Sequence, residues 1–298
     1  MPVISATQIL PCAKPMHTPI PEEPAPSILS IVTVCYNSAL TIGETMASID
    51  RAVCGTAPGT VDHLVVDGLS TDNTLRVVKR FDAPYRRLLH EQDSGIYNAM
   101  NKGVGLARGK YVWFINSDDL VDPYASCWMG ELLETLDKEE YEVLVGELKM
   151  FRGRTGHRQL TRIWHLPQNI ERARRFGWLP PHPAFIAKRS LIMALGGFDE
   201  RRRLSADIKL MDGALRSSRG RIGRFPHNLT LMREGGVSTA SLHAVLRCNA
   251  ECYRIFRESG YGSVRAGIEI VMRLTRKVFQ KGGAMFAGGD LACMEPFR

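Results

Sequence analysis

Between residues 28 and 119 the sequence alternates between short apolar runs rich in β-branched residues and amphipathic segments. The first run, ILSIVTVCY at 28–36, carries no charged residue, which is typical of a strand covered on both faces. Further strands are expected at 63–66, 87–90 and 110–115, and helices at 39–53, 70–81 and 95–108. Elements that alternate in this way predict an α/β fold, a mostly parallel sheet flanked by helices.

The remainder of the chain follows a less regular pattern, and 151–180 shows no clean period. Further elements are expected at 124–137 (helix), 141–145 (strand), 189–195, 241–258 and 263–281 (helices). We therefore divide the chain into a disordered, proline-rich extension (1–27), one α/β domain (28–240) and a helical, basic C-terminal arm (241–298).

The composition indicates the cellular compartment in which the protein is expected. Seven cysteines without a CxxC pair form neither a disulfide framework nor a zinc site, which favours a reducing compartment. Residues 1–27 lack the apolar core of a signal peptide, and no run of about 18 apolar residues is present to span a membrane. We expect a cytoplasmic protein. Its net charge of +8 suits anionic partners, but it equally fits an ordinary solvated surface.

Acidic residues follow three successive strands. Asp67 ends the second expected strand, Asp93 lies in the turn after the third, and Asp118 and Asp119 follow the fourth. Ligands of open α/β sheets bind outside the carboxyl ends of the strands, so these acids should share one edge. Each alone fits a turn or a helix cap, but together they repel one another without a cation. The pattern predicts Mg²⁺ or Mn²⁺ bridging to phosphates, because the chain has neither a Walker loop nor a GxGxxG motif.

Several motifs occur in the order and spacing of a known family. They are SIVTVCYN (30–37), VDG (66–68), STDNT (70–74), DSGIYNAMNKG (93–103), NSDD (116–119), PHPAF (181–185), GGFDE (196–200), AD (206–207) and GGVS (235–238). Over roughly 28–240 the chain resembles the family 2 glycosyltransferases of the GT-A fold, in particular bacterial enzymes of the exopolysaccharide and colanic-acid type. The resemblance implies transfer of a sugar from a UDP- or GDP-sugar to a glycan or lipid-linked oligosaccharide, in cell-surface polysaccharide biosynthesis.

The resemblance places the donor site in 28–119 and the acceptor half in 120–240. Asp67 should face the nucleobase, and Asp93 should help to close the same pocket. Tyr36 and Asn37 are also expected to bind the donor.

The family's DXD motif reads Ser117-Asp118-Asp119 in this chain, so its first acid is missing. Asp119 is therefore the expected ligand of Mg²⁺ or Mn²⁺. Asp118 would contact the ribose or the metal.

In the acceptor half, Asp207 matches the acid that the family places near the acceptor hydroxyl. A carboxylate there takes up the hydroxyl proton during direct attack on the anomeric carbon, which inverts that centre. A helix N-cap is the alternative role for this residue. The family often carries an aromatic residue and a second acid next, where this chain has Ile208 and Lys209, so Asp199 and Asp212 are kept as substitute bases.

His182 lies between two prolines in a segment that matches the family's histidine-containing loop. We expect it to bind the donor phosphates or to approach the acceptor; ordering of the loop is the alternative. Trp164 and Trp178 fit either a platform for sugar stacking or packing in the core.

The segment 263–281 combines an apolar side with many basic residues, which fits peripheral contact with the inner membrane. A helix packed on the domain with a solvated basic face is the alternative.

Three other functions compete with sugar transfer: a nucleotidyltransferase, a degenerate protein that binds a nucleotide sugar without turnover, and a basic nucleic-acid-binding protein. No RNA- or DNA-binding motif supports the last, so no nucleic-acid partner is expected.

Overall fold

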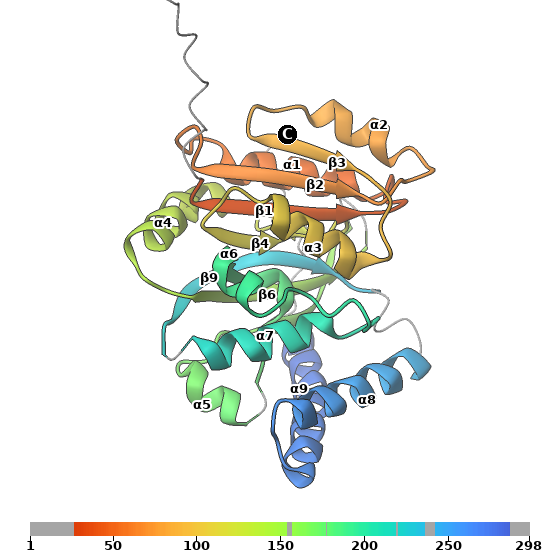
Figure 1. Cartoon of the computed structure of the whole chain (residues 1–298), viewed down its shortest axis with the longest axis vertical. Coiled ribbons are helices and arrows are strands. Elements are labelled where there is room, and N and C mark those ends of the chain that lie inside the picture. Colours follow the sequence, from red (N-terminus) through yellow and green to blue (C-terminus); the bar gives the residue numbers. More distant parts are fainter. Residues whose placement is uncertain (1–26, 154–156, 177, 219, 236–241, 287–298) are drawn as a thin grey trace, which may run out of the picture.

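The computed structural model describes residues 27–153, 157–176, 178–218, 220–235 and 242–286. Its first half contains β1 (Leu29–Cys35), α1 (Ile42–Val53), β2 (Val61–Asp67), α2 (Thr74–Val78), β3 (Arg86–His90), α3 (Ile96–Leu106) and β4 (Tyr111–Phe114). The four strands pair in parallel in the order β3-β2-β1-β4 (Figure 1). The predicted alternation of strand and helix is confirmed, although the helix expected at 70–81 is only α2 followed by a 3₁₀ turn.

Helices cover both faces of this half because successive β1 side chains point in opposite directions. Ile31 shares a buried cluster with Ile49 of α1, whereas Val32 shares one with Met100 of α3. Every β1 residue is buried, which explains why this run is apolar throughout. In the first turn of α3 the side chain that packs into the core is Tyr97. Ile96 fits the helical spacing of apolar residues, but its side chain is 48% exposed.

The second half extends the same sheet with antiparallel as well as parallel strands. It contains β5 (Leu120–Val121), α4 (Ala125–Lys138), β6 (Val143–Arg152), β7 (Gln159–Trp164), α5 (Ile170–Arg175), β8 (Phe185–Lys188), α6 (Arg189–Ala194), α7 (Ala206–Ser217) and β9 (Ile222–Arg233). The order continues β4-β8-β6-β9-β5, and β7 pairs with β6. Strand β8 is antiparallel to both β4 and β6 and so joins the two halves into one nine-stranded sheet.

Several of these strands differ from the sequence-based expectation. The stretch 151–180, which shows no period, holds β7 and α5, and β9 was not expected. Strand β9 contains Pro226, which cannot donate to a ladder, and the register between β6 and β9 shifts there, from Val145 opposite Arg224 to Glu147 opposite Asn228. Because a proline argues against a strand, the alternation of apolar and polar residues does not predict a strand that contains one at a bulge.

The C-terminal arm consists of α8 (Leu242–Glu258) and α9 (Ser263–Phe286), beyond α7 in Figure 1. Its buried side chains belong to the same cluster as the α3 and α7 side chains: Cys248, Cys252, Ile255, Phe256, Tyr261 and Ala266. The arm therefore completes the core on this face of the sheet. Within the described ranges, no helix is long and apolar enough to cross a membrane. The expected proline-rich extension lies almost wholly outside the described residues.

Candidate active site

The loops at the carboxyl ends of β1, β2 and β4 are held together by short hydrogen bonds. The hydroxyl of Ser117 donates to that of Ser38 over 2.8 Å, which links the loops after β4 and β1. Asn37 Oδ1 accepts from the Thr71 amide over 2.8 Å, which links the loops after β1 and β2. Asn37 has a positive φ of 50°, which asparagine tolerates better than most residues. Its neighbour Tyr36 is 60% exposed at this edge.

Asp67 is fully buried and its carboxylate already has several partners. Oδ2 accepts from the Ser70 amide (3.0 Å) and lies 2.6 Å from His90 Nδ1. Oδ1 accepts from the Ser70 hydroxyl (2.5 Å) and from Cys35 Sγ (3.5 Å). Asp67 thus fixes the loop after β2 and the ring of His90. The His90 side chain itself is 38% exposed.

Asp93 reaches the same place from the loop after β3. A Cβ on Gly68 would lie 2.2 Å from Asp93 Oδ2, so this approach requires glycine next to Asp67. Asp93 Oδ1 accepts from the Gly95 amide over 2.9 Å, at a residue with a φ of +136°. The predicted meeting of Asp67 and Asp93 at one edge is thus found, with Gly68 between them.

Asp118 and Asp119 follow β4, and Asp119 is almost fully buried. Asp119 Oδ1 accepts from the backbone amide of Arg233 (3.0 Å), and Oδ2 accepts from Asn116 Nδ2 (3.3 Å). Burial raises the pKa of Asp118. Burial, together with the charge of Asp118, raises the pKa of Asp119 well above its ordinary value. The charge of Arg233 lowers the pKa of both acids and so partly opposes these effects. The Arg233 guanidinium forms its hydrogen bonds with Glu44 (2.9 Å) and with backbone oxygens, including that of Asp118, rather than with the two carboxylates.

The oxygen atoms around this acid pair fit a hard divalent cation. Asn116 Oδ1 is buried without a hydrogen-bond partner in the described part of the chain. Among the described residues no three His, Cys, Asp or Glu side chains gather in a metal-binding group. A cation here would be held by Asp119, Asp118 and the Asn116 amide oxygen, and water and phosphate oxygens would complete its shell. Mg²⁺ is commonly bound in this manner, by one or two carboxylates plus substrate phosphates.

Asp207 lies in the first turn of α7, where Ser205 is the N-cap residue. The Tyr97 hydroxyl donates to Asp207 Oδ1 over 3.2 Å. His182 is 8% exposed and stacks on Phe114 with 5.2 Å between the ring centroids. Burial lowers the pKa of His182, and the charge of Asp207 partly opposes this effect. Its Nε2 is buried without a partner among the described residues. Asp207, Tyr97 and a neutral His182 thus form a second polar group.

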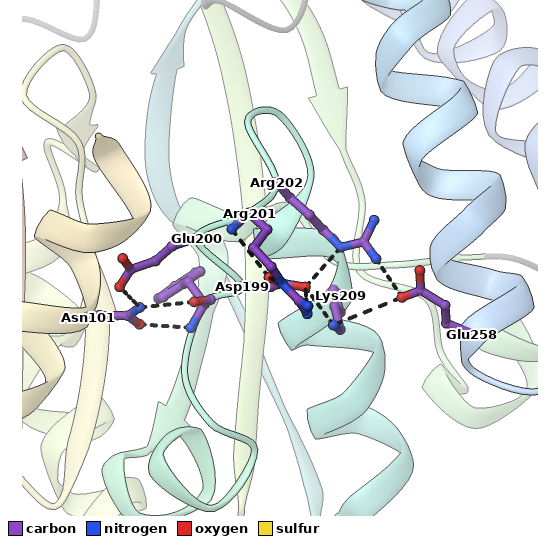
Figure 2. Close-up of polar contacts among 8 residues, drawn as sticks. Asn101, Asp199, Glu200, Arg201, Arg202, Lys209 and Glu258 are labelled. Carbon is purple, nitrogen blue, oxygen red and sulfur yellow. Dashed lines mark hydrogen bonds and ion pairs between the residues drawn. The ribbon is translucent and has the colours of Figure 1, made fainter. Parts of the chain in front are cut away.

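Asp199, a substitute base, lies in an ion-pair network (Figure 2). It is bonded to Arg201 (2.9 Å), Lys209 (2.8 Å) and Arg202 (3.3 Å), and the first two hydrogen bonds lower its pKa strongly. A carboxylate stabilised in this way is a poor proton acceptor. Glu258 of α8 joins the network through Arg202 over 2.5 Å.

Asp212, the other substitute base, is buried on α7, and burial raises its pKa. Its Oδ1 accepts from the Tyr261 hydroxyl over 3.5 Å, at the contact with the arm. Of the three acids, Asp207 is the one that lies beside Tyr97 and His182. Trp178 is 6% exposed in the core, which favours packing over sugar stacking for this residue.

Some residues of the site were not singled out from the sequence. Arg233 ends β9 two residues before the GGVS motif, most of which (236–238) lies outside the described residues. Tyr97 and Asn116 lie inside motifs quoted above, but only the structure shows that they face Asp207 and Asp119. His90 ends β3 as Asp67 ends β2, and this equivalence was the available signal.

The fold and the acids at its edge define an α/β protein with a nucleotide-type site. Residues 30–193 match the family model described as "Glycosyl transferase family 2", and the chain belongs to this family. The chain is 30% identical over 188 residues to a "PGL/p-HBAD biosynthesis glycosyltransferase" of Mycobacterium bovis (strain BCG / Pasteur 1173P2), covering 61% of this chain and 68% of that protein. It is 30% identical over 114 residues to the uncharacterized glycosyltransferase YibD of Escherichia coli, covering 38% and 31%.

Solved structures show the same fold. S. aureus TarS in complex with UDP-GlcNAc aligns with a TM-score of 0.60 at 20% identity, over 80% of this chain and 69% of that one. The mannosyltransferase PcManGT of Pyrobaculum calidifontis, in complex with GDP-Man and Mn²⁺, aligns with a TM-score of 0.58 at 18% identity, over 92% and 79%. The predicted GT-A fold is confirmed, and the protein is a glycosyltransferase by family.

Proposed function

We propose that this glycosyltransferase is an inverting, metal-dependent enzyme. It moves a sugar from a UDP- or GDP-sugar to a hydroxyl of a glycan or lipid-linked oligosaccharide, in cell-surface polysaccharide biosynthesis. The observation that carries the proposal is the Asp118–Asp119 pair, in which Asp118 is half-buried and Asp119 buried, beside the unpartnered Asn116 oxygen. Arg233 compensates the charge of this acid pair only in part, since the pKa of Asp119 is still raised well above its ordinary value. The solved structures of TarS and PcManGT, which share the fold, are complexes with UDP-GlcNAc and with GDP-Man.

The donor and acceptor ends of the site have different chemical tasks. At the donor end, Asp67 and Asp93 position the nucleobase pocket through Ser70, Gly68 and the exposed His90 ring. Tyr36 and Asn37 contribute to the wall of this pocket. When bound at Asp119, Mg²⁺ or Mn²⁺ would neutralise charge on the departing diphosphate.

At the acceptor end, Asp207 accepts the proton of the attacking hydroxyl. The new bond to the anomeric carbon forms as the bond to the diphosphate oxygen breaks, so the configuration inverts. Tyr97 orients the carboxylate through its hydrogen bond. His182 stays neutral because it is buried, and its free Nε2 is available to hydrogen-bond donor phosphate or acceptor hydroxyl.

Lys209, which departs from the family pattern, does not argue for a degenerate protein. Its ammonium is bonded to Asp199 and lies 4.0 Å from Glu258, so its charge is compensated away from Asp207. A nucleotidyltransferase would release pyrophosphate rather than a nucleoside diphosphate, and the products separate the two reactions.

We also propose peripheral membrane contact through α9. Its outer side exposes an apolar stripe: Val264, Ile268, Val271 and Leu274. Its other side is packed, since Ala266 and Glu269 are buried. The structure does not describe the basic side chains between 273 and 281. Co-sedimentation with anionic vesicles tests the contact: Ile268→Glu should reduce it, and unchanged sedimentation would contradict it.

The decisive experiment measures nucleoside diphosphate release from a panel of UDP- and GDP-sugars, with and without Mn²⁺. We expect release from one donor to depend on metal and to fall more than about 100-fold in Asp119→Asn, since a metal supplies several kcal/mol of charge stabilisation. Asp122→Asn is the matched control, because this buried acid bonds to Tyr124 and Asn228 outside the site. Absence of release from every donor, with membrane extract as acceptor source, would contradict the proposal and favour a protein that only binds nucleotide sugars.

A further inference from the structure

A cavity of about 370 Å³ lies between the loop that precedes α7 and helix α8 of the arm. Its lining is dominated by arginine: Arg201, Arg203, Arg247, Ala250, Glu251 and Arg254. The two sets of arginines are more than 40 residues apart in the sequence, so no motif search detects them. Apart from Arg201, which is paired with Asp199, none of these residues belongs to the site described above.

The charges in this cavity are not balanced. Arg201 is paired with Asp199 at 2.9 Å, and Glu251 accepts a hydrogen bond from the Ser205 hydroxyl over 2.6 Å. Within the described residues, the exposed Arg203, Arg247 and Arg254 have no carboxylate partner. Glu251 is the acid among these lining residues and offsets one of their charges. The guanidinium groups that remain repel one another, and an anion between them reduces that repulsion.

A second cavity, of about 590 Å³, shows that arginines in a lining do not by themselves indicate an anion-binding site. Its arginines are Arg174, Arg216 and Arg265. Each is near an acid, at 3.3 Å from Glu171, 3.8 Å from Asp212 and 3.9 Å from Glu269 respectively. The first cavity differs because three of its arginines are left for an external partner. Guanidinium forks match phosphate oxygens in geometry as well as in charge.

The position of the cavity separates it from the donor. Figure 1 shows α8 on the other side of α7 from β1, β2 and β3, whose loops carry Asp67 and Asp93. The bond from Ser205 to Glu251 joins the cavity to the N-terminus of α7, and Asp207 follows two residues later. The cavity is thus next to the acceptor end of the site. We propose that it binds a phosphate or diphosphate group of the acceptor, which makes the acceptor a lipid-phosphate-linked glycan. This inference rests on the proposed function for the assignment of the acceptor end.

The test uses the full-length protein and a triple variant, Arg203→Gln/Arg247→Gln/Arg254→Gln. Titration calorimetry with inorganic pyrophosphate should show binding that weakens by about tenfold or more in the variant, because several charged hydrogen bonds are lost. The matched control, Arg76→Gln/Arg80→Gln/Arg224→Gln, removes the same charge from exposed arginines elsewhere and should bind like wild type. Equal binding by wild type and the first variant would overturn the proposal.

Vesicles separate the possible sources of the phosphate. Vesicles of a zwitterionic lipid doped with a polyprenyl diphosphate should bind wild type more strongly than vesicles of equal charge doped with phosphatidylglycerol, and the excess should disappear in the triple variant. Equal binding to both vesicles would show a general response to charge and overturn the proposal. Nucleoside diphosphate release to water should be the same in both proteins. If wild type releases no nucleoside diphosphate, that result counts against the proposed function, whatever the pyrophosphate titration shows.

Discussion

Tyr97 is bonded to the proposed base and is also part of the core. Its ring stacks on Phe198 with 5.7 Å between centroids, and only its hydroxyl contacts Asp207. The two roles are therefore separable by substitution, because phenylalanine keeps the ring and removes the hydrogen bond.

We expect Tyr97→Phe to fold normally and to lower kcat about 10- to 100-fold, because a hydrogen bond to a charged group contributes about 1.5–3 kcal/mol. The KM for the donor should change little, since Tyr97 lies at the acceptor end. Steady-state kinetics with varied donor, together with thermal unfolding, check this prediction. A kcat equal to that of wild type would show that Asp207 needs no such support.

At the scale of elements, His63 connects three strands inside the parallel half of the sheet. Its Nε2 lies 3.0 Å from Thr33 Oγ1 of β1, and its Nδ1 accepts from Arg86 Nε of β3 over 2.9 Å. Full burial, with a smaller contribution from Arg86, lowers the pKa of His63 well below its ordinary value. Protonation would also remove the acceptor that Arg86 uses.

This arrangement makes stability depend on pH. Below about pH 6.5 an unfolded histidine takes up a proton that the folded His63 does not bind, so the free energy of unfolding falls as pH falls. Each such histidine contributes at most about 1.4 kcal/mol per pH unit, and the buried His182 acts in the same direction. Urea unfolding between about pH 7 and 5 should show a shallower slope for His63→Gln. His157→Gln, at an exposed position, is the control, and identical slopes in all three proteins would refute the prediction.

The elements that could be predicted from the sequence are those specified locally. Strands β1 to β4 are apolar runs between amphipathic helices. Because the carboxyl ends of parallel strands lie at one edge of a sheet, Asp67, Asp93 and Asp119 could be expected to lie at that edge. Strands β7 and β9 depend on pairing with the distant β6 and have half-exposed faces, so their patterns are weak. For the same reason the contact between Tyr97 and Asp207, 110 residues apart, was not visible from the sequence.

At the scale of the whole molecule, the arm and the α/β domain share one buried core. Phe256 of α8 is 2% exposed and packs beside Tyr261, and both belong to the cluster that contains α3 and α7 side chains. Removal of the arm would therefore expose the core of the domain.

We expect Phe256→Ala to lower the free energy of unfolding by about 3–5 kcal/mol, the usual cost of deleting a large core side chain. Leu246→Ala on the same helix should change it by less than about 0.5 kcal/mol, because Leu246 is 61% exposed. Denaturant unfolding checks both values. A small effect at Phe256 would mean that the arm is a separate unit, as the sequence-based division implied.

The pairing of β4 with β8 also determines when this protein can fold during its synthesis. Strand β4 is complete at Phe114, but the neighbour on its outer side, β8, begins only at Phe185. Translation proceeds at about 5–20 residues per second, so a nascent chain spends several seconds with the edge of a buried strand unpaired. Such an edge is a template for pairing with other chains. The interval between the two strands is thus a period in which the growing chain can pair with other chains through this edge.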